Sequence, residues 1–298
     1  MDKKLKIQIL SNSASSKRGP GIVHHNLMKG FTLPAFHDVA VYQNEWINDD
    51  SAYVVCLSPT KQFEDLGINS EDINLVGPNN WEIPTTEVAS KYQDFLVPSQ
   101  WVKGLYESFD CMQGKNIHIW PVGIDTDEWA QTDVTEKSLD CLIYYKNAGE
   151  ELGEQVVDLL TENNLSGGSL SYGSYEEKDL AQAVSQCKFC ILVTKTESQG
   201  IAYMQILSAG LPCFVLEKDR WDDRSDGIAC DASSVPYFDE RCGQKISQSS
   251  SYESKQTAFA TFLENIKNNE YNPREYILEN HTLEISTRNF ISILEGCG

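Results

Sequence analysis

The sequence lacks any long hydrophobic run, since no apolar stretch approaches the ~20 residues that a membrane-spanning helix needs. It is also poor in basic residues, with 24 Lys and Arg against 44 Asp and Glu and a formal net charge of −20. Nucleic acids and anionic membrane surfaces attract basic proteins, so neither is an expected partner. The apolar part of the N-terminal segment is too short and broken for a signal peptide. We therefore expect a cytoplasmic protein without a membrane span.

Paired metal-binding motifs and a disulfide framework are missing as well. The nine cysteines are an odd number without regular spacing. Cys187 and Cys190 form one Cys-x-x-Cys pair, but neither a second pair nor a matching His pair follows, so a zinc site is not indicated. Free cysteines behave as small hydrophobic residues, so we expect this pair in a buried strand. His118 lies in another predicted strand and is expected to be structural.

What is present is an alternation of short apolar strands with helical patterns over 298 residues, 41% of them hydrophobic. The pattern predicts strands at 6–10, 52–57, 73–76, 94–99, 117–122, 139–145, 169–172, 189–193 and 212–216. It predicts helices at 22–30, from near 99, and at 149–160, 178–186, 201–209, 254–268 and 272–294, with a loop over 219–251. Because the pattern begins again after Gly123, we expect two α/β domains with a ligand-binding cleft.

The most informative stretch runs from Tyr172 to Pro212. A predicted strand ends at about Thr194, a loop carries Glu197 and Gly200, and a helix begins directly afterwards. Backbone amides at a helix start can face a phosphate or a sugar hydroxyl, and a glycine there lets a ligand approach closely. Glu197 and Gln205, eight positions apart, would line one wall of a pocket.

This stretch resembles the acidic signature of retaining glycosyltransferases of the GT-B fold, the family 4-like group (group 1), in which two Glu residues are separated by seven positions. Other segments are similar to the same family in the same order: Gly19-Pro-Gly, Val97-Pro-Ser-Gln-Trp, Pro121-Val-Gly-Ile-Asp and Asn272-Pro-Arg-Glu-Tyr. The resemblance implies two Rossmann-like domains facing a cleft. Residues 1–122 would form a shortened acceptor-side domain, residues 123–270 a nucleotide-sugar-binding domain, and residues 271–298 a terminal helix packing back on the first domain.

The resemblance also implies a metal-independent site without a cofactor, whose partners are a nucleotide-diphosphate sugar donor and a glycan or other hydroxyl acceptor. Glu197 would bond hydroxyls of the donor sugar, and Lys146 would neutralise charge on the leaving diphosphate; these are the catalytic candidates. Gln205 would hold the ribose, and Tyr172 and Gly173 would lie against the nucleobase. Gly19 and Gly21 would let the first domain's backbone close on the diphosphate and acceptor. The donor-binding candidates are Gly19, Gly21, Tyr172, Gly173, Gln199, Gly200, Ile201, Ala202 and Gln205.

The sequence departs from the family pattern in four respects. Gln205 replaces the second Glu, and Lys146 stands alone where the family usually has an Arg and a Lys near the diphosphate. The family's first-domain His has no clear match, and the first domain is shorter than is usual. The acceptor-side candidates are therefore Asn79, Asn80 and Trp81, together with His24. Adjacent helical residues point in different directions, so of His24 and His25 one is expected to be packed and the other exposed.

The first hypothesis is a hexosyltransferase acting in glycan biosynthesis. The alternatives are a catalytically lapsed GT-B scaffold that binds a sugar nucleotide or glycan without transfer, and another GT-B chemistry such as sugar-nucleotide epimerisation. Taken alone, Glu197 would read as an ordinary loop carboxylate and Lys146 as a solvated strand end.

Overall fold

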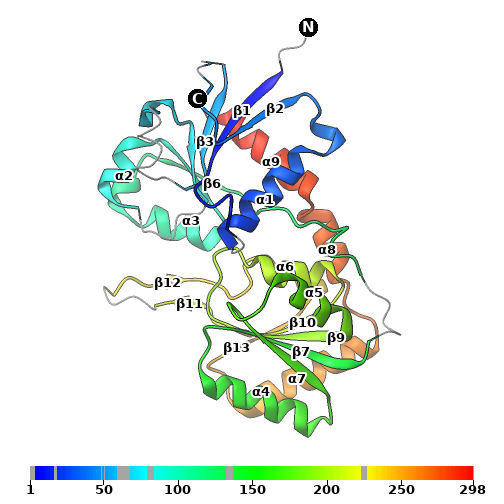
Figure 1. The fold of residues 1–298 in the computed structure, drawn as a ribbon. Helices are drawn as coiled ribbons and strands as arrows, with labels where there is room; N and C mark the ends of the chain where they lie inside the picture. The colour runs from blue at the N-terminus through cyan, green and yellow to red at the C-terminus, as the bar shows by residue number, and fades with distance from the viewer. Residues whose placement is uncertain are drawn as a thin grey trace. The chain divides into compact units, whose positions relative to one another are not determined.

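The computed structural model describes residues 4–16, 19–47, 49, 51–58, 68–78, 84–131, 137–222 and 227–297. The chain divides into two compact units, residues 1–123 with 283–298 and residues 124–282. Each unit has a parallel β-sheet with helices on both faces (Figure 1). The α/β class expected from the alternating pattern is therefore confirmed. Among the residues described, no helix combines the length and apolar character required to cross a membrane.

The first unit is built on a six-stranded sheet with the order β2-β1-β3-β4-β5-β6. Its strands are β1 (Leu5–Leu10), β2 (Val39–Gln43), β3 (Tyr53–Cys56), β4 (Leu75–Val76), β5 (Asp94–Val97) and β6 (Asn116–Ile119). The sequence pattern did not predict β2. This edge strand pairs only with β1 and has no fully buried residue, so it carries no strong apolar signal.

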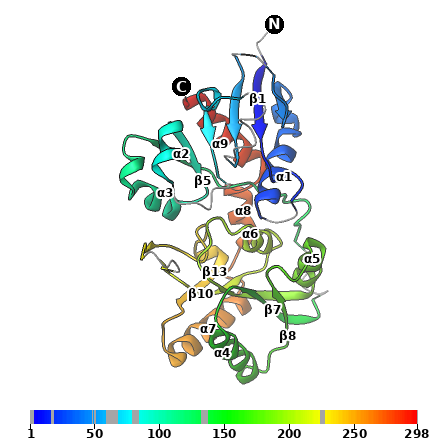
Figure 2. The same cartoon turned by 60° about the vertical axis from the view of Figure 1, so that its left-hand side comes forward.

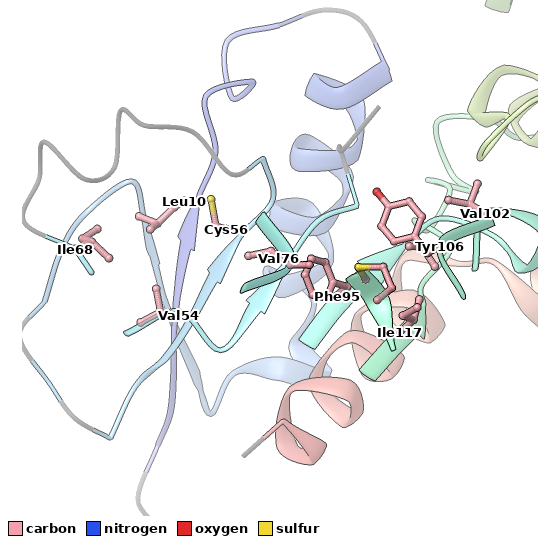
Figure 3. Packing of buried hydrophobic residues seen from close by; sticks show 12 residues of the cluster. Leu10, Val54, Cys56, Ile68, Val76, Phe95, Val102, Tyr106 and Ile117 are labelled. Carbon is pink, nitrogen blue, oxygen red and sulfur yellow. The ribbon is translucent and has the colours of Figure 1, made fainter. Parts of the chain in front are cut away.

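Two pairs of helices cover the two faces of this sheet: α1 (Gly19–Phe31) with α9 (Leu283–Gly296), and α2 (Thr86–Lys91) with α3 (Gln100–Glu107) (Figures 1 and 2). Figure 3 shows the core on the α2 and α3 side, where Phe95 packs with Val76, Tyr106 and Ile117. Alternate strand residues point to opposite faces, so each strand supplies both cores. Each buried large apolar side chain stabilises the fold by about 1.5–3 kcal/mol.

The second unit is built on a five-stranded sheet with the order β13-β10-β9-β7-β8. Its strands are β7 (Leu139–Lys146), β8 (Gly167–Ser171), β9 (Cys187–Thr194), β10 (Cys213–Glu217) and β13 (Gly243–Ser247). A separate short antiparallel pair, β11 (Arg220–Trp221) and β12 (Cys230–Asp231), lies between β10 and β13 in the chain. Cys187 and Cys190 are free thiols buried in β9, as expected.

Helices lie on both faces of this second sheet as well, with α4 (Glu150–Glu162) and α7 (Tyr252–Lys267) on one face and α5 (Glu177–Gln186) and α6 (Ile201–Ser208) on the other (Figures 1 and 2). Phe189 and Phe214 of the sheet meet Phe259 and Phe262 of α7 with ring centroids 5.1–6.1 Å apart. This aromatic cluster joins α7 to the central strands.

Three sequence predictions about element boundaries were wrong. The helix predicted at 22–30 begins at Gly19, so the expected glycine loop is the first turn of α1. The segment 219–251, predicted as loop, contains β13, which has one large apolar residue and takes its register from β10. The helix predicted at 272–294 is two helices, α8 (Pro273–Asn280) and α9.

The break between α8 and α9 has a tertiary cause. Ile124 N donates to the carbonyl of His281 at 2.7 Å, and Ile124 forms a β-bridge with Thr282. These bonds take the backbone out of helical geometry at His281. As a result, residues 271–282 belong to the second unit, while α9 packs against α1 in the first.

Candidate functional site

The site in the second unit forms where two neighbouring parallel strands end. Lys146 is the last residue of β7 and pairs in register with Thr194, the last residue of β9. Glu197 follows three positions later in the loop before α6. Lys146 Nζ donates to Glu197 Oε2 at 2.7 Å, so the sheet brings together two predicted residues that are 51 positions apart. The carboxyl ends of parallel strands are where open α/β sheets carry their sites.

The ion pair lies in a largely desolvated position. The Glu197 side chain is 7% exposed and that of Lys146 is 20% exposed. Burial raises the pKa of the Glu197 carboxyl, and the neighbouring ammonium of Lys146 opposes that rise. Lys146 Nζ also lies over the ring of Tyr172, 4.4 Å from its centroid, so a third predicted residue joins the cluster. A cation held between a carboxylate and an aromatic face is a ready partner for a ligand anion.

Backbone and side-chain bonds from distant segments fix the loop that carries Glu197. Glu197 N donates to the carbonyl of Ser233 at 2.8 Å. The carbonyl of Thr194 accepts from Ser234 Oγ at 3.2 Å and from Gln248 Nε2 at 2.7 Å. Sequence reasoning missed these three positioning residues. Their segment looked like an ordinary Ser-rich loop, and no local motif marks side-chain bonds that span 40 and 54 positions.

The same loop buries two polar groups that remain unbonded. Thr194 Oγ1 and Gln199 Nε2 are buried and have no hydrogen-bond partner among the residues that the structure describes. Leaving such a group unsatisfied costs about 1–3 kcal/mol. These two groups belong to residues on either side of Glu197 in the chain, and a hydroxyl and an amide donor are groups that can bond the hydroxyls of a ligand.

Gly200 has a structural reason to be glycine that does not depend on a ligand. Its φ of +79° lies in the left-handed region, and a Cβ there would lie 1.9 Å from Cε1 of Tyr203. That ring cannot simply turn away, because it is buried and its hydroxyl accepts from Tyr237 N at 2.9 Å. The helix that follows begins with two further predicted residues, buried Ile201 and half-buried Ala202.

Gln205 is bonded to a residue that the sequence did not single out. Its Nε2 donates to Glu177 Oε1 of α5 at 2.7 Å, and the Gln205 side chain is buried. A carboxylate therefore stands beside the position where the family pattern has its second Glu. The bond spans 28 positions, so no spacing in the sequence signals it. The predicted residue Gly173 lies in the turn before α5 and has a φ of +87°.

A pocket of about 850 Å³ opens on the α4 side of the strand ends. It is lined by Tyr145, Asn147, Ala148, Gly149, Glu150, Gly153, Glu154, Val157, Asp158, Ser171 and Tyr172. The three carboxylates of α4 would repel a diphosphate. Lys146 lies outside this lining.

The remaining predicted residues belong to the first unit. Gly19 and Gly21 lie in the first turn of α1, and a Cβ on Gly21 would lie 1.7 Å from the carbonyl oxygen of Ser16. His24 is buried on the same helix and His25 is exposed, as expected for adjacent helical residues. Burial lowers the pKa of His24, and the neighbouring His25 adds to that effect. The acceptor-side candidates Asn79, Asn80 and Trp81 lie outside the described residues.

Comparison with known proteins gives matches in structure only. No family model and no curated protein sequence matches the chain. AviGT4, a glycosyltransferase involved in avilamycin A biosynthesis, matches over 98% of this chain and 97% of its own, with a TM-score of 0.57 and 7% identity. Sucrose-phosphate synthase from Thermosynechococcus elongatus matches over 98% of each chain, with a TM-score of 0.56 and 11% identity.

Two further matches agree. WaaG, a glycosyltransferase involved in lipopolysaccharide biosynthesis, matches over 97% of this chain and 100% of its own, with a TM-score of 0.56 and 11% identity. The chain spans only 58% of a chain of the GtfA/B complex, with a TM-score of 0.52. At these identities the likeness concerns the fold. The chain has the GT-B fold, and the two parallel-sheet α/β units that the resemblance implied are confirmed.

Proposed function

We propose that this GT-B chain is a retaining glycosyltransferase that moves a hexose-type sugar from a nucleotide-diphosphate donor to a hydroxyl of a glycan or similar acceptor. The observation that carries the proposal is the largely desolvated Lys146–Glu197 ion pair at the ends of β7 and β9. It places a cation that can bind a diphosphate beside a carboxylate that can accept a hydrogen bond from a sugar hydroxyl. The unbonded side-chain groups of Thr194 and Gln199 add further capacity for hydrogen bonds to a sugar.

In this mechanism the bound donor separates the ion pair, with the diphosphate contacting Lys146 and the sugar contacting Glu197. Lys146 moves its hydrogen bond from Glu197 to a diphosphate oxygen, and the freed carboxylate accepts from a sugar hydroxyl. As the glycosidic bond breaks, negative charge grows on the leaving diphosphate, and one well-placed donor stabilises it by about 3–4 kcal/mol. A diphosphate oxygen then takes the proton of the acceptor hydroxyl, which attacks the same face of the sugar. The protein supplies position and charge rather than a strong base.

The ribose would be held by a pair of residues rather than by one. Gln205 donates to Glu177 and so fixes its carboxylate, leaving the second carboxylate oxygen to accept from ribose hydroxyls. Tyr172, which is 43% exposed, offers its ring to the nucleobase. No metal has a role in this scheme because Lys146 carries the positive charge. The proposed setting is the cytoplasm, where nucleotide sugars are substrates.

A ligand screen followed by turnover measurements tests the proposal. Thermal unfolding is measured with UDP, GDP, ADP and their common sugar conjugates. A ligand at about a hundred times its dissociation constant adds about 2.7 kcal/mol of stability, which is easily detected. Transfer to hydroxyl acceptors is then measured with the conjugate that binds, and the anomeric configuration of the product is assigned by NMR. We expect retention.

The variants Lys146→Ala and Glu197→Ala should each lower transfer by orders of magnitude while the fold persists. Lys188→Ala is the matched control, because Lys188 lies on β9 and pairs with Asp140 at 2.8 Å near the opposite end of the sheet. Unchanged turnover in both site variants would refute the site. Binding without transfer to any acceptor would instead indicate a lapsed scaffold, and product formed without an acceptor would indicate an epimerase.

A further inference from the structure

A second cluster of reactive side chains lies in the first unit, on the face of the sheet that α9 covers. Asp94 begins β5, His118 lies in the middle of β6, and Cys297 directly follows α9. Their ligand atoms all lie within 4.8 Å of one another. Within the described part of the chain, no other group of three His, Cys or carboxylate side chains is close enough to share a metal ion.

Strand register explains how the cluster forms. β5 and β6 are parallel neighbours, with Asp94 opposite Asn116 and Leu96 opposite His118. Residues 116 and 118 of β6 share one face with Trp120, which directly follows the strand and donates from Nε1 to the carbonyl of Ser286 in α9 at 2.9 Å. This bond holds α9 over this face of the sheet, so that Cys297, which follows α9, lies beside Asp94 and His118.

The spacing of the three ligand atoms suits a tetrahedral ion. His118 Nε2 lies 2.9 Å from Asp94 Oδ1 and 4.0 Å from Cys297 Sγ. With bonds of about 2.0–2.1 Å to nitrogen and oxygen and about 2.3 Å to sulfur, tetrahedral ligands stand about 3.3 Å and 3.6 Å apart. Both distances from His118 are within about 0.4 Å of these values, and the third pair, Asp94 and Cys297, lies within 4.8 Å, so side-chain adjustments would bring the three ligand atoms to a common centre.

The surroundings have the other features of a metal site. Asn116 Nδ2 donates to Asp94 Oδ1 at 3.0 Å, which orients the carboxylate as outer-shell partners do. Asp94 and Cys297 are buried, whereas the His118 side chain is 26% exposed. Partial exposure of His118 would give an ion access, and three protein ligands leave the fourth position of a tetrahedral site for water.

We propose that Asp94, His118 and Cys297 bind a divalent transition-metal ion of the Zn²⁺ type. A thiolate and an imidazole favour such an ion over Mg²⁺ or Ca²⁺, which prefer oxygen ligands. On binding, the thiol of Cys297 gives up its proton to solvent and its sulfur bonds the metal; no redox change occurs. The metal fastens the end of α9 to β5 and β6. This site is independent of the proposed transfer chemistry, and it gives His118 a role beyond the structural one expected from the sequence.

The test uses the full chain, stripped with a chelator and titrated with Co²⁺ and then Zn²⁺. We expect one ion per chain, a sulfur-to-cobalt charge-transfer band that disappears when Zn²⁺ displaces Co²⁺, and a higher unfolding temperature with Zn²⁺. Loss of an outer-shell partner typically weakens metal binding about 10- to 100-fold, so loss of a ligand should cost at least that.

Two conservative variants, Cys297→Ser and Asp94→Asn, should each abolish the Zn²⁺-dependent rise in unfolding temperature, and Cys297→Ser should also remove the charge-transfer band. Cys111→Ser is the matched control, a half-buried cysteine of the same unit, and it should behave as the native chain does. Circular dichroism checks that each variant is folded. Absence of stoichiometric binding by the native chain, or binding that persists in both ligand variants, would overturn the proposal and mark the cluster as hydrogen-bonded polar residues only.

Discussion

Lys146 and Glu197 meet at 2.7 Å because β7 and β9 are neighbours in the sheet, although 51 positions separate them in the chain. The charge of Lys146 offsets part of the free-energy cost of burying the Glu197 carboxylate. Removing one partner of a buried ion pair leaves the other charge uncompensated.

Lys146→Met should therefore destabilise the chain, and since Lys146 is partly exposed the loss should be about 2–3 kcal/mol. The double variant Lys146→Met with Glu197→Gln should lose less than the two single variants together, because no unpaired charge remains. Urea unfolding of the four proteins measures this coupling. Strict additivity of the two single losses would mean that the pair is not coupled in solution.

The bond between Gln205 and Glu177 predicts the outcome of restoring the family's second Glu. Gln205→Glu alone would place a buried carboxylate 2.7 Å from another carboxylate, so we expect a loss of about 1–3 kcal/mol and no gain in donor binding. The exchanged pair, Gln205→Glu with Glu177→Gln, reverses donor and acceptor and should recover most of that stability. Thermal unfolding and nucleotide titration of the native chain and the two variants decide the matter. A stable, better-binding single variant would contradict the role given to Glu177.

His281 should make the chain sensitive to acid. Burial lowers the pKa of His281 to about 4. The unfolded chain gains a proton there near its ordinary pKa of about 6.5, whereas the native chain stays neutral until about pH 4. Stability is therefore lost as the pH falls through this window, by up to about 3 kcal/mol from this one group.

In the variant His281→Phe that loss should disappear, since Phe keeps the ring contacts with Tyr237 and Tyr276 and cannot be protonated. The measurement is urea unfolding at about pH 7 and about pH 4.5, with exposed His37→Phe as the control. If native chain and His281→Phe lose the same stability over this window, His281 is not the group responsible.

Gly200→Ala should cost more than the left-handed backbone alone explains. The added methyl would meet the buried Tyr203 ring, so we expect a loss of about 2–4 kcal/mol. Gly227→Ala is the matched control: its φ of +77° is similar, but a Cβ there meets nothing within 4 Å, so only the backbone cost of about 1–2 kcal/mol applies. Denaturant midpoints of the two variants make the comparison. Equal losses would show that Tyr203 yields without cost.

Local patterns carried the prediction of the elements that build both sheets. The apolar run of β9 and the strand that ends at Lys146 were placed within a few residues, because a buried strand must be apolar at nearly every position. The order of motifs also indicated the GT-B fold. The edge strands β2 and β13 escaped notice, since half-exposed residues show little pattern and neighbouring backbone fixes their register.

The sequence by itself determined the alternation of strands and helices, and hence the positions of Lys146 and Glu197 at strand ends. Only the tertiary structure decided which strands are neighbours, and so which side chains meet. Ser233 holding the Glu197 loop, Glu177 facing Gln205, and Cys297 beside His118 all depend on packing between distant segments. The break at His281 does too, because a bond from Ile124 outweighs the local helical preference. Periodicity reports which face of an element is buried, but it carries no information about the partner that buries it.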